Sequence, residues 1–517
     1  MEHIRSLIVQ DKFQEALESI GGYEARDPHD AILQFNKLGF LVDIGSGLGD
    51  QAVLRQALDI GERNLEDHMY TEHDSDIHYN LANGYASLYY LTERRLGTRS
   101  IPRSVNLQKA KGHLRDALRT GDESRRDFRK QVFVNYGNCL DMLGRGVEAF
   151  DAYDAAIAID EHFSMAIGNR AKALRFFADI SGRYRGAIYI EAYQAIKSII
   201  DNQDLIAIGG PSARKSFEDE LQEIASRFKD KTDLTKRLAH PNYSTTNLST
   251  FEEYYLAFCA KEKLFLNFHV HDTQCESAIT DPIFISLITP IDDDTFYRLA
   301  KSINQIKEDY AVARLLLVQS QFKREDFNNI SRRTTFVNSS DNARFDLYSG
   351  LLKSAFTEAY NILDKIAVFI NDYYGLGLPI RYVYFASIWQ EDGKKKDGRI
   401  EGGKIRDKVL ESKNISLYAL YDIFQDFNSG CYEHLKTIRD ASTHRTLVIY
   451  DPAVADSDKG SDKDSIGYNT MLGETISLLR LAKSSIIYLI NCVNIEENRK
   501  RGSDLIAPVF VDTSQFL

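Results

Sequence analysis

The sequence predicts a mainly α-helical protein with three parts: helical repeats at the N-terminus, a mixed connecting region, and a C-terminal bundle of four to five helices. The chain has 517 residues, which exceeds what one hydrophobic core usually organises, so we expect several domains. Only nine prolines occur. Apolar residues recur over long stretches at spacings of three and four, the period of an amphipathic helix.

Composition narrows the class of protein. Hydrophobic residues make up 43% and charged residues 27%, which is typical of a globular protein. The net charge of -11 excludes a polybasic nucleic-acid coat, so any basic site has to be local. The five cysteines form no CxxC pair, which argues against a disulfide framework or a zinc ribbon and favours a reducing cytoplasm. Because no apolar run reaches eighteen residues and the N-terminal segment is amphipathic, we expect neither secretion nor a membrane partner.

Residues 1–180 carry a degenerate internal repeat. In the stretch "FVNYGNCLDMLGRGVEAFDAYDAAIAID", Tyr136 and Gly137 are followed by Tyr153 and Ala156. This spacing resembles the tetratricopeptide repeat, in which a small residue allows two helices to cross closely. Stacked helical hairpins form a concave surface that usually binds a peptide or protein, so we expect such a partner here. A non-repeating helical bundle is the alternative.

Residues 181–335 are expected to be a connecting region of uncertain fold. They alternate helical stretches with a polar loop and a short segment bounded by prolines. His269, His271, Asp272 and Cys275 are residue types that bind zinc, but no second cluster completes a tetrahedral set. We therefore expect ordinary structural polar residues there, and no metal site.

Residues 336–500 are predicted to form the helical bundle, with 501–517 as a tail. A long amphipathic helix in "ARFDLYSGLLKSAFTEAYNILDKIAVFINDYYG" opens it, and "NISLYALYDIFQDF" supplies a second. A third has a buried stripe of Tyr432, Leu435 and Ile438, and "MLGETISLLRLAKSSIIYLINCVN" closes the bundle.

The third helix carries the stretch "RDASTH", in which His444 follows Arg439 by five residues. Spacing alone decides little, because twelve histidines should produce such a pair about once by accident. "RNLEDH" indeed sets Arg63 and His68 at the same distance, but among acidic neighbours that would repel a phosphate. In a regular helix His444 would lie about 140° around from Arg439. The two side chains would then flank a groove whose small and polar residues leave room for a phosphate.

This motif within such a bundle resembles the HEPN superfamily, named for higher eukaryotic and prokaryotic nucleotide-binding domains. Its ribonuclease members carry arginine, a polar residue, three variable residues and histidine. The resemblance implies an endoribonuclease that needs no metal and no cofactor: the 2'-hydroxyl attacks the neighbouring phosphorus, leaving a cyclic phosphate and a 5'-hydroxyl.

By the same resemblance, His444 would act as general acid or base, since imidazole changes protonation near neutral pH. Arg439 would hold the phosphate through paired donors. Asp440 or Thr443 could orient the imidazole, and Lys436 and Arg445 could contact the RNA.

Members of this family usually place two motifs face to face across a dimer. Because this chain carries one good motif, the resemblance implies a homodimer through the C-terminal bundle. Tetratricopeptide repeats ahead of a HEPN domain also look like a known prokaryotic arrangement, which suggests a toxin-like hydrolase in stress or anti-phage defence. The alternative is a non-catalytic scaffold in which Arg439 and His444 form a helix-end ion pair, or in which the bundle holds a nucleotide.

Overall fold

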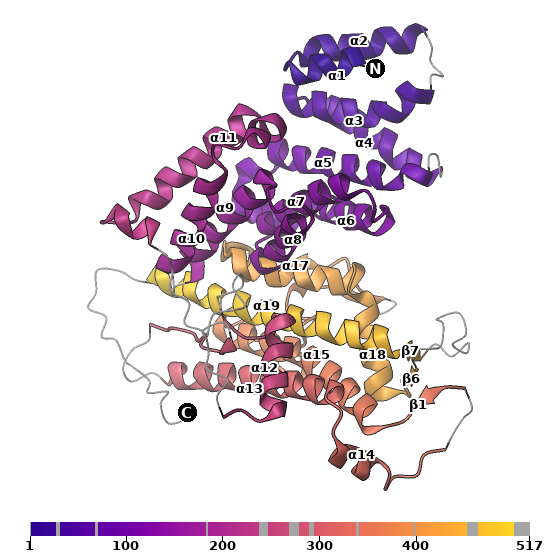
Figure 1. The fold of residues 1–517 in the computed structure, drawn as a ribbon, viewed down its shortest axis with the longest axis vertical. Coiled ribbons are helices and arrows are strands. Elements are labelled where there is room, and N and C mark those ends of the chain that lie inside the picture. Colours follow the sequence, from indigo (N-terminus) through magenta and orange to yellow (C-terminus); the bar gives the residue numbers. More distant parts are fainter. Residues whose placement is uncertain are drawn as a thin grey trace. The chain divides into compact units, whose positions relative to one another are not determined.

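The computed structural model confirms the mainly α fold, since helices dominate and the strands are two or three residues long (Figure 1). The chain divides into two compact units, and the first combines Met1–Asp179 and Arg183–Ala239 with the later segment Glu391–Tyr432. The second combines Ile180–Gly182, His240–Gln390 and Glu433–Leu517. The structure describes residues 2–26, 31–67, 71–181, 185–236, 247–267, 279–288, 294–337, 341–396, 399–451 and 464–500. The predicted tail, 501–517, lies outside these residues.

In the first unit, most helices that are neighbours in sequence are also neighbours in space (Figure 1). This is the arrangement that stacked helical hairpins produce, while the tetratricopeptide repeat itself stays a prediction. The helices are α1 (Glu2–Val9), α2 (Phe13–Arg26), α3 (Ala31–Leu48), α4 (Gln51–Glu66), α5 (Asp74–Thr92), α6 (Val105–Thr120), α7 (Arg126–Met142), α8 (Gly146–Ile159), α9 (Ser164–Ser181, whose last two residues fall in the second unit), α10 (Arg185–Ile199) and α11 (Gln203–Ser226). Short 3-10 helices join some of them, among them η3 (Thr98–Arg103).

Two glycines explain how closely these helices cross. A Cβ atom added at Gly137 of α7 would lie 2.6 Å from the ring of Tyr153 on α8. At Gly61 of α4, it would lie 2.6 Å from Leu81 of α5. Real Cβ atoms do not approach other atoms so closely, so a larger residue at Gly137 would displace the Tyr153 ring and one at Gly61 would displace the Leu81 side chain. The small residue that the repeat pattern predicted at Gly137 therefore has the expected structural role.

The first unit also contains α17 (Ile415–Ser429), which the sequence placed in the C-terminal bundle. The helix is apolar on almost every side. Its buried side chains include Leu417, Tyr418, Leu420, Tyr421, Ile423 and Phe424. Before it come α16 (Asp407–Glu411) and the short strands β3 (Lys394–Lys396), β4 (Arg399–Glu401) and β5 (Lys404–Ile405).

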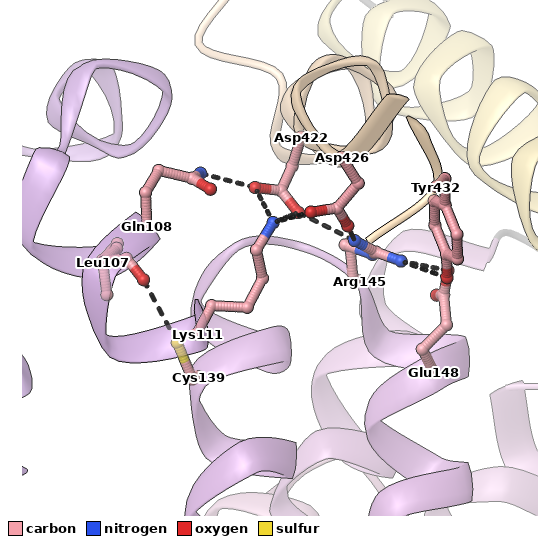
Figure 2. Close-up of polar contacts among 9 residues, drawn as sticks. All are labelled: Leu107, Gln108, Lys111, Cys139, Arg145, Glu148, Asp422, Asp426 and Tyr432. Carbon is pink, nitrogen blue, oxygen red and sulfur yellow. Dashed lines mark hydrogen bonds and ion pairs between the residues drawn. The ribbon is translucent and has the colours of Figure 1, made fainter. Parts of the chain in front are cut away.

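A buried cluster of charges fixes α17 within the first unit (Figure 2). Asp422 and Asp426 are four residues apart, so they lie on the same face of α17. Lys111 of α6 places its Nζ 2.8 Å from Asp422 Oδ2 and 2.9 Å from Asp426 Oδ1. Arg145, just before α8, places its Nη1 3.0 Å from Asp422 and 2.5 Å from Asp426. None of the four side chains is more than 6% exposed.

Each charge in this cluster is compensated. Burial alone would lower the pKa of Lys111, but the two carboxylates outweigh it and hold this pKa above its ordinary value. Burial alone would raise the pKa of Asp426, but Lys111 and Arg145 outweigh it and hold this pKa below its ordinary value. Arg145 also donates to Glu148 of α8 at 3.1 Å. Buried charges persist only with such partners.

The second unit is built around three long helices that pack on one another, α13, α15 and α19. The sequence analysis placed α13 in the connecting region. In the structure α13 packs against α15 and belongs to the same core. The helices are α12 (Thr250–Lys261), α13 (Thr295–Gln321), α14 (Glu325–Ser331), α15 (Leu347–Tyr373), α18 (Glu433–His444) and α19 (Tyr468–Lys500). A small sheet joins β1 (Ala343–Arg344), antiparallel to β6 (Val448–Tyr450), which is parallel to β7 (Ser465–Gly467).

Helix α19 is long and apolar enough to span a membrane, by length and composition alone, and no other helix in the described ranges passes this test. Its most apolar stretch is 83% buried within the protein. A buried core helix meets the same criteria, and packing against α13 and α15 accounts for the apolar composition.

Candidate functional site

The predicted motif lies on α18, which ends at His444. Leu435 and Ala441 are the buried residues of this helix, and it packs on α15. Arg439 lies at the same interface: its guanidinium carbon is 5.6 Å from the ring centre of Tyr360 on α15. The helical position that the sequence predicted for the motif is therefore confirmed.

The Arg439 guanidinium is partly buried, and only some of its N–H groups make hydrogen bonds. Its side chain is 25% exposed, and its Nη1 lies 3.2 Å from Asp440 Oδ1. Its buried Nε has no hydrogen-bond partner among the residues that the structure describes. The exposed part of the guanidinium, rather than this buried nitrogen, can donate hydrogen bonds to an anionic ligand.

Two residues of α15 complete the surroundings of Arg439. Tyr360 and Asp364 are four residues apart and therefore lie on one face. Burial raises the pKa of the Tyr360 hydroxyl and of the Asp364 carboxyl, and the positive charge of Arg439 opposes both shifts. Asp364 Oδ1 accepts a hydrogen bond from the backbone N–H of Phe385 at 2.8 Å. The arginine thus faces a half-buried aromatic ring and a half-buried carboxyl group.

Sequence reasoning did not identify Tyr360 or Asp364. Each directly follows a residue of the buried stripe, Ala359 and Leu363. A polar pair at a four-residue spacing beside an apolar stripe was the available signal, because such residues face the neighbouring helix.

His444 is exposed at the end of α18. Within the described part of the chain its ring makes no hydrogen bond or ion pair. Ideal helix geometry separates it from Arg439 by about 7.5 Å along the axis and about 140° around it. The imidazole is consequently free to meet a ligand, while Arg439 is held against α15.

The supporting residues are arranged differently from the expectation. The Asp440 carboxylate lies on Arg439, and no described contact joins Asp440 or the exposed Thr443 to His444. The exposed Arg445 pairs with Asp464 at 3.0 Å. Lys436 is half-buried on the same helix.

Metal ligands do not gather anywhere in the ranges that the structure describes: no three His, Cys, Asp or Glu side chains lie close enough to hold an ion. The candidate residues His269, His271, Asp272 and Cys275 lie outside those ranges.

Comparison with known proteins supports the expected family. A family model described as LA2681-like HEPN matches residues 291–496. The match begins two helices earlier than the predicted bundle and takes in α13 and α14, in agreement with the packing of α13 on α15. A search of curated proteins found no match.

Proposed function

Residues 291–496 form an LA2681-like HEPN domain, and on this premise we propose that the protein is a metal-independent endoribonuclease. The observation that carries the proposal is the arrangement on α18. The Arg439 side chain, 25% exposed, lies on the same helix as the exposed His444, whose imidazole makes no hydrogen bond or ion pair within the described residues.

The two groups suit the chemistry of transesterification. His444 takes the proton from the 2'-hydroxyl or gives a proton to the leaving 5'-oxygen, and each such transfer contributes about 10² to 10⁴ in rate. Arg439 binds the non-bridging oxygens and stabilises the charge that grows on them in the transition state. The Tyr360 ring packs against the guanidinium, and the charge of Arg439 lowers the pKa of the nearby Asp364 carboxyl against the effect of burial.

The test is RNA cleavage by the purified full chain in EDTA. His444→Ala should abolish cleavage without lowering the thermal unfolding temperature, because the side chain is exposed. His434→Ala is the matched control: His434 lies on the same helix, is also exposed and pairs with Glu474 at 3.1 Å. The control should keep its activity. Cleavage by the His444→Ala protein at the wild-type rate would contradict the assignment.

The mechanism has a second readout in the products. A 2'-deoxy substitution at the cleaved position should block the reaction, since the nucleophile is then missing. Wild-type products should end in a cyclic phosphate. Products with a 3'-hydroxyl would rule out attack by the 2'-hydroxyl.

A homodimer through the C-terminal bundle follows from the same proposal. Two copies of α18 would supply two imidazoles, one as base and one as acid. Light scattering on the full chain should give twice the monomer mass of 58.9 kDa. We further propose that the repeat domain binds a peptide or protein that controls the nuclease, in stress or anti-phage defence.

One observation favours the scaffold alternative. The contact of Arg439 with Tyr360 and Asp440 is also what a purely structural arginine would make. Expression toxicity separates the two: a nuclease should slow host growth, and Arg439→Ala or His444→Ala should relieve the effect.

A further inference from the structure

The segment after α15 presents several large side chains to solvent. Ile380 is 74% exposed, Tyr382 58% and Tyr384 54%, whereas Val383 and Phe385 between and after them are buried. Ile380, Tyr382 and Tyr384 are close together in the chain, and clustered exposed apolar side chains mark candidate interaction sites better than single ones do.

This segment is held in place, so the exposure is built into the fold. The backbone N–H of Tyr384 donates to Ser387 Oγ at 2.9 Å, and Ser387 Oγ donates to the carbonyl oxygen of Tyr382 at 2.7 Å. Ile388 and Trp389 directly after it are fully buried. Tyr382 and Tyr384 are therefore displayed from an anchored loop.

The same loop is joined to the motif site. The Phe385 N–H binds Asp364, whose pKa responds to the charge of Arg439. One turn earlier on α15, Tyr360 lies under the Arg439 guanidinium. Tyr384 directly precedes Phe385 in the chain. The exposed tyrosines are therefore connected to Arg439 through Phe385 and the Asp364–Tyr360 face of α15.

The charge of the loop is positive at the exposed rings. The Arg381 guanidinium carbon lies 4.7 Å from the ring centre of Tyr382. Arginine beside exposed aromatic rings is the combination that binds unpaired bases, since the rings stack on bases and the cation attracts the phosphates. A twofold contact between two copies of this surface would instead bring like charges together, which disfavours self-association.

We propose that Arg381, Tyr382 and Tyr384 form a stacking platform that binds unpaired bases of single-stranded RNA beside the Arg439 site. The inference rests on the proposed ribonuclease function and restricts its substrate to RNA with unpaired bases. Bases within a duplex are already stacked and paired, so the platform selects unpaired RNA.

The test uses the full chain with His444→Ala, which removes turnover, and a single-stranded RNA that contains 2-aminopurine. Stacking on a tyrosine quenches this base, so binding should reduce its fluorescence. Tyr382→Ala with Tyr384→Ala should lower the affinity about 5- to 100-fold and abolish the quenching, whereas the two phenylalanine substitutions should preserve both.

Tyr297→Ala is the control, because Tyr297 is 65% exposed on α13 of the same unit and lies outside the platform. It should bind like the parent protein. Duplex RNA should bind equally to all variants. In the cleaving wild-type background, the double alanine variant should raise KM and leave kcat unchanged.

The outcomes separate this proposal from the nuclease proposal. If the wild type cleaves RNA and the double alanine variant shows an unchanged KM and unchanged quenching, the platform is refuted and the nuclease stands. If the wild type never cleaves but quenching still depends on the two tyrosines, the platform stands and the nuclease fails. Loss of dimerisation in the double alanine variant, with RNA affinity intact, would assign the surface to a second copy and overturn the platform.

Discussion

Replacing Lys111 by methionine is the sharpest test of how α17 is held. Methionine keeps the length and the apolar stem of the side chain but removes the ammonium group. Asp422 and Asp426 would then share only Arg145 among the cations of the cluster, in a site where their side chains are 2% and 6% exposed. The substitution therefore leaves two buried carboxylates with one cation, so one negative charge is no longer compensated.

The burial of the cluster indicates how much unfolding free energy the Lys111→Met substitution should remove. Removing one partner from a buried ion pair costs about 3–5 kcal/mol. The matched control is Lys109→Met on the same helix, whose side chain is 46% exposed and pairs with Glu62. Exposed pairs contribute about 0–1 kcal/mol, so the control should lose far less stability.

The measurement is unfolding in urea combined with hydrogen exchange of residues 415–429. Lys111→Met should shift the midpoint well below that of the control and speed exchange in α17. Adding Asp422→Asn should recover part of the loss, because it restores the balance of charge. Equal midpoints for Lys111→Met and Lys109→Met would refute the reasoning.

The pH dependence of the cluster has a definite sign. The folded-state pKa of Asp426 is lowered, so its stabilisation is present above the ordinary carboxyl value of about 3.9 and is lost as pH falls through the folded pKa. The folded-state pKa of Lys111 is raised, so its stabilisation is present below about 10.4 and is lost only as pH rises through the higher folded value. The Lys111→Met deficit should stay constant from about pH 5 to 9 and shrink in acid.

Three further outcomes are expected. Arg439→Lys should lower the single-turnover rate of RNA cleavage about 10²- to 10³-fold at an unchanged unfolding temperature, because lysine lacks the paired donors that fit a phosphate. Asp364→Asn should raise stability at pH 7, because the raised pKa of Asp364 means that its charged form opposes folding; this gain should vanish in acid, as thermal melts across pH would show. Asn491→Leu in α19 should stabilise the fold by about 1–3 kcal/mol in urea unfolding, because both amide atoms of the fully buried Asn491 have no partner within the described residues.

Much of the fold could be predicted from the sequence because it depends on local periodicity. The long helix α15 and the motif helix α18 both follow the spacing of their apolar residues. Gly137 was identified from its place in a repeat pattern, and the structure gives it the expected close contact with Tyr153. The resemblance to the HEPN superfamily was likewise carried by a short motif in a regular helix, and the family match confirms it.

What the sequence could not supply is pairing between distant segments. Lys111 and Asp422 are 311 residues apart, and no local pattern marks them as partners. Tyr360 and Asp364 are similar: their relation to Arg439 depends on how α18 packs against α15. Helix periodicity fixes which face is buried but not which helix covers it.

The cluster on α17 also bears on how the family domain is organised. The family match, residues 291–496, includes α17, yet α17 is buried in the first unit, together with the N-terminal helices. Hydrophobic residues of similar size would often hold a helix as well as a buried ion pair does. Two carboxylates one turn apart can meet Lys111 and Arg145 in only one rotation of the helix.

Residues 430–432 follow α17 directly and precede α18. Tyr432, the last of them, accepts a hydrogen bond from Arg145 Nη2 at 3.5 Å, so the same arginine that holds Asp426 also holds the residue before α18 (Figure 2). A protein that contains only the matched residues 291–496 would lack Lys111 and Arg145, both cations that neutralise the buried Asp422 and Asp426.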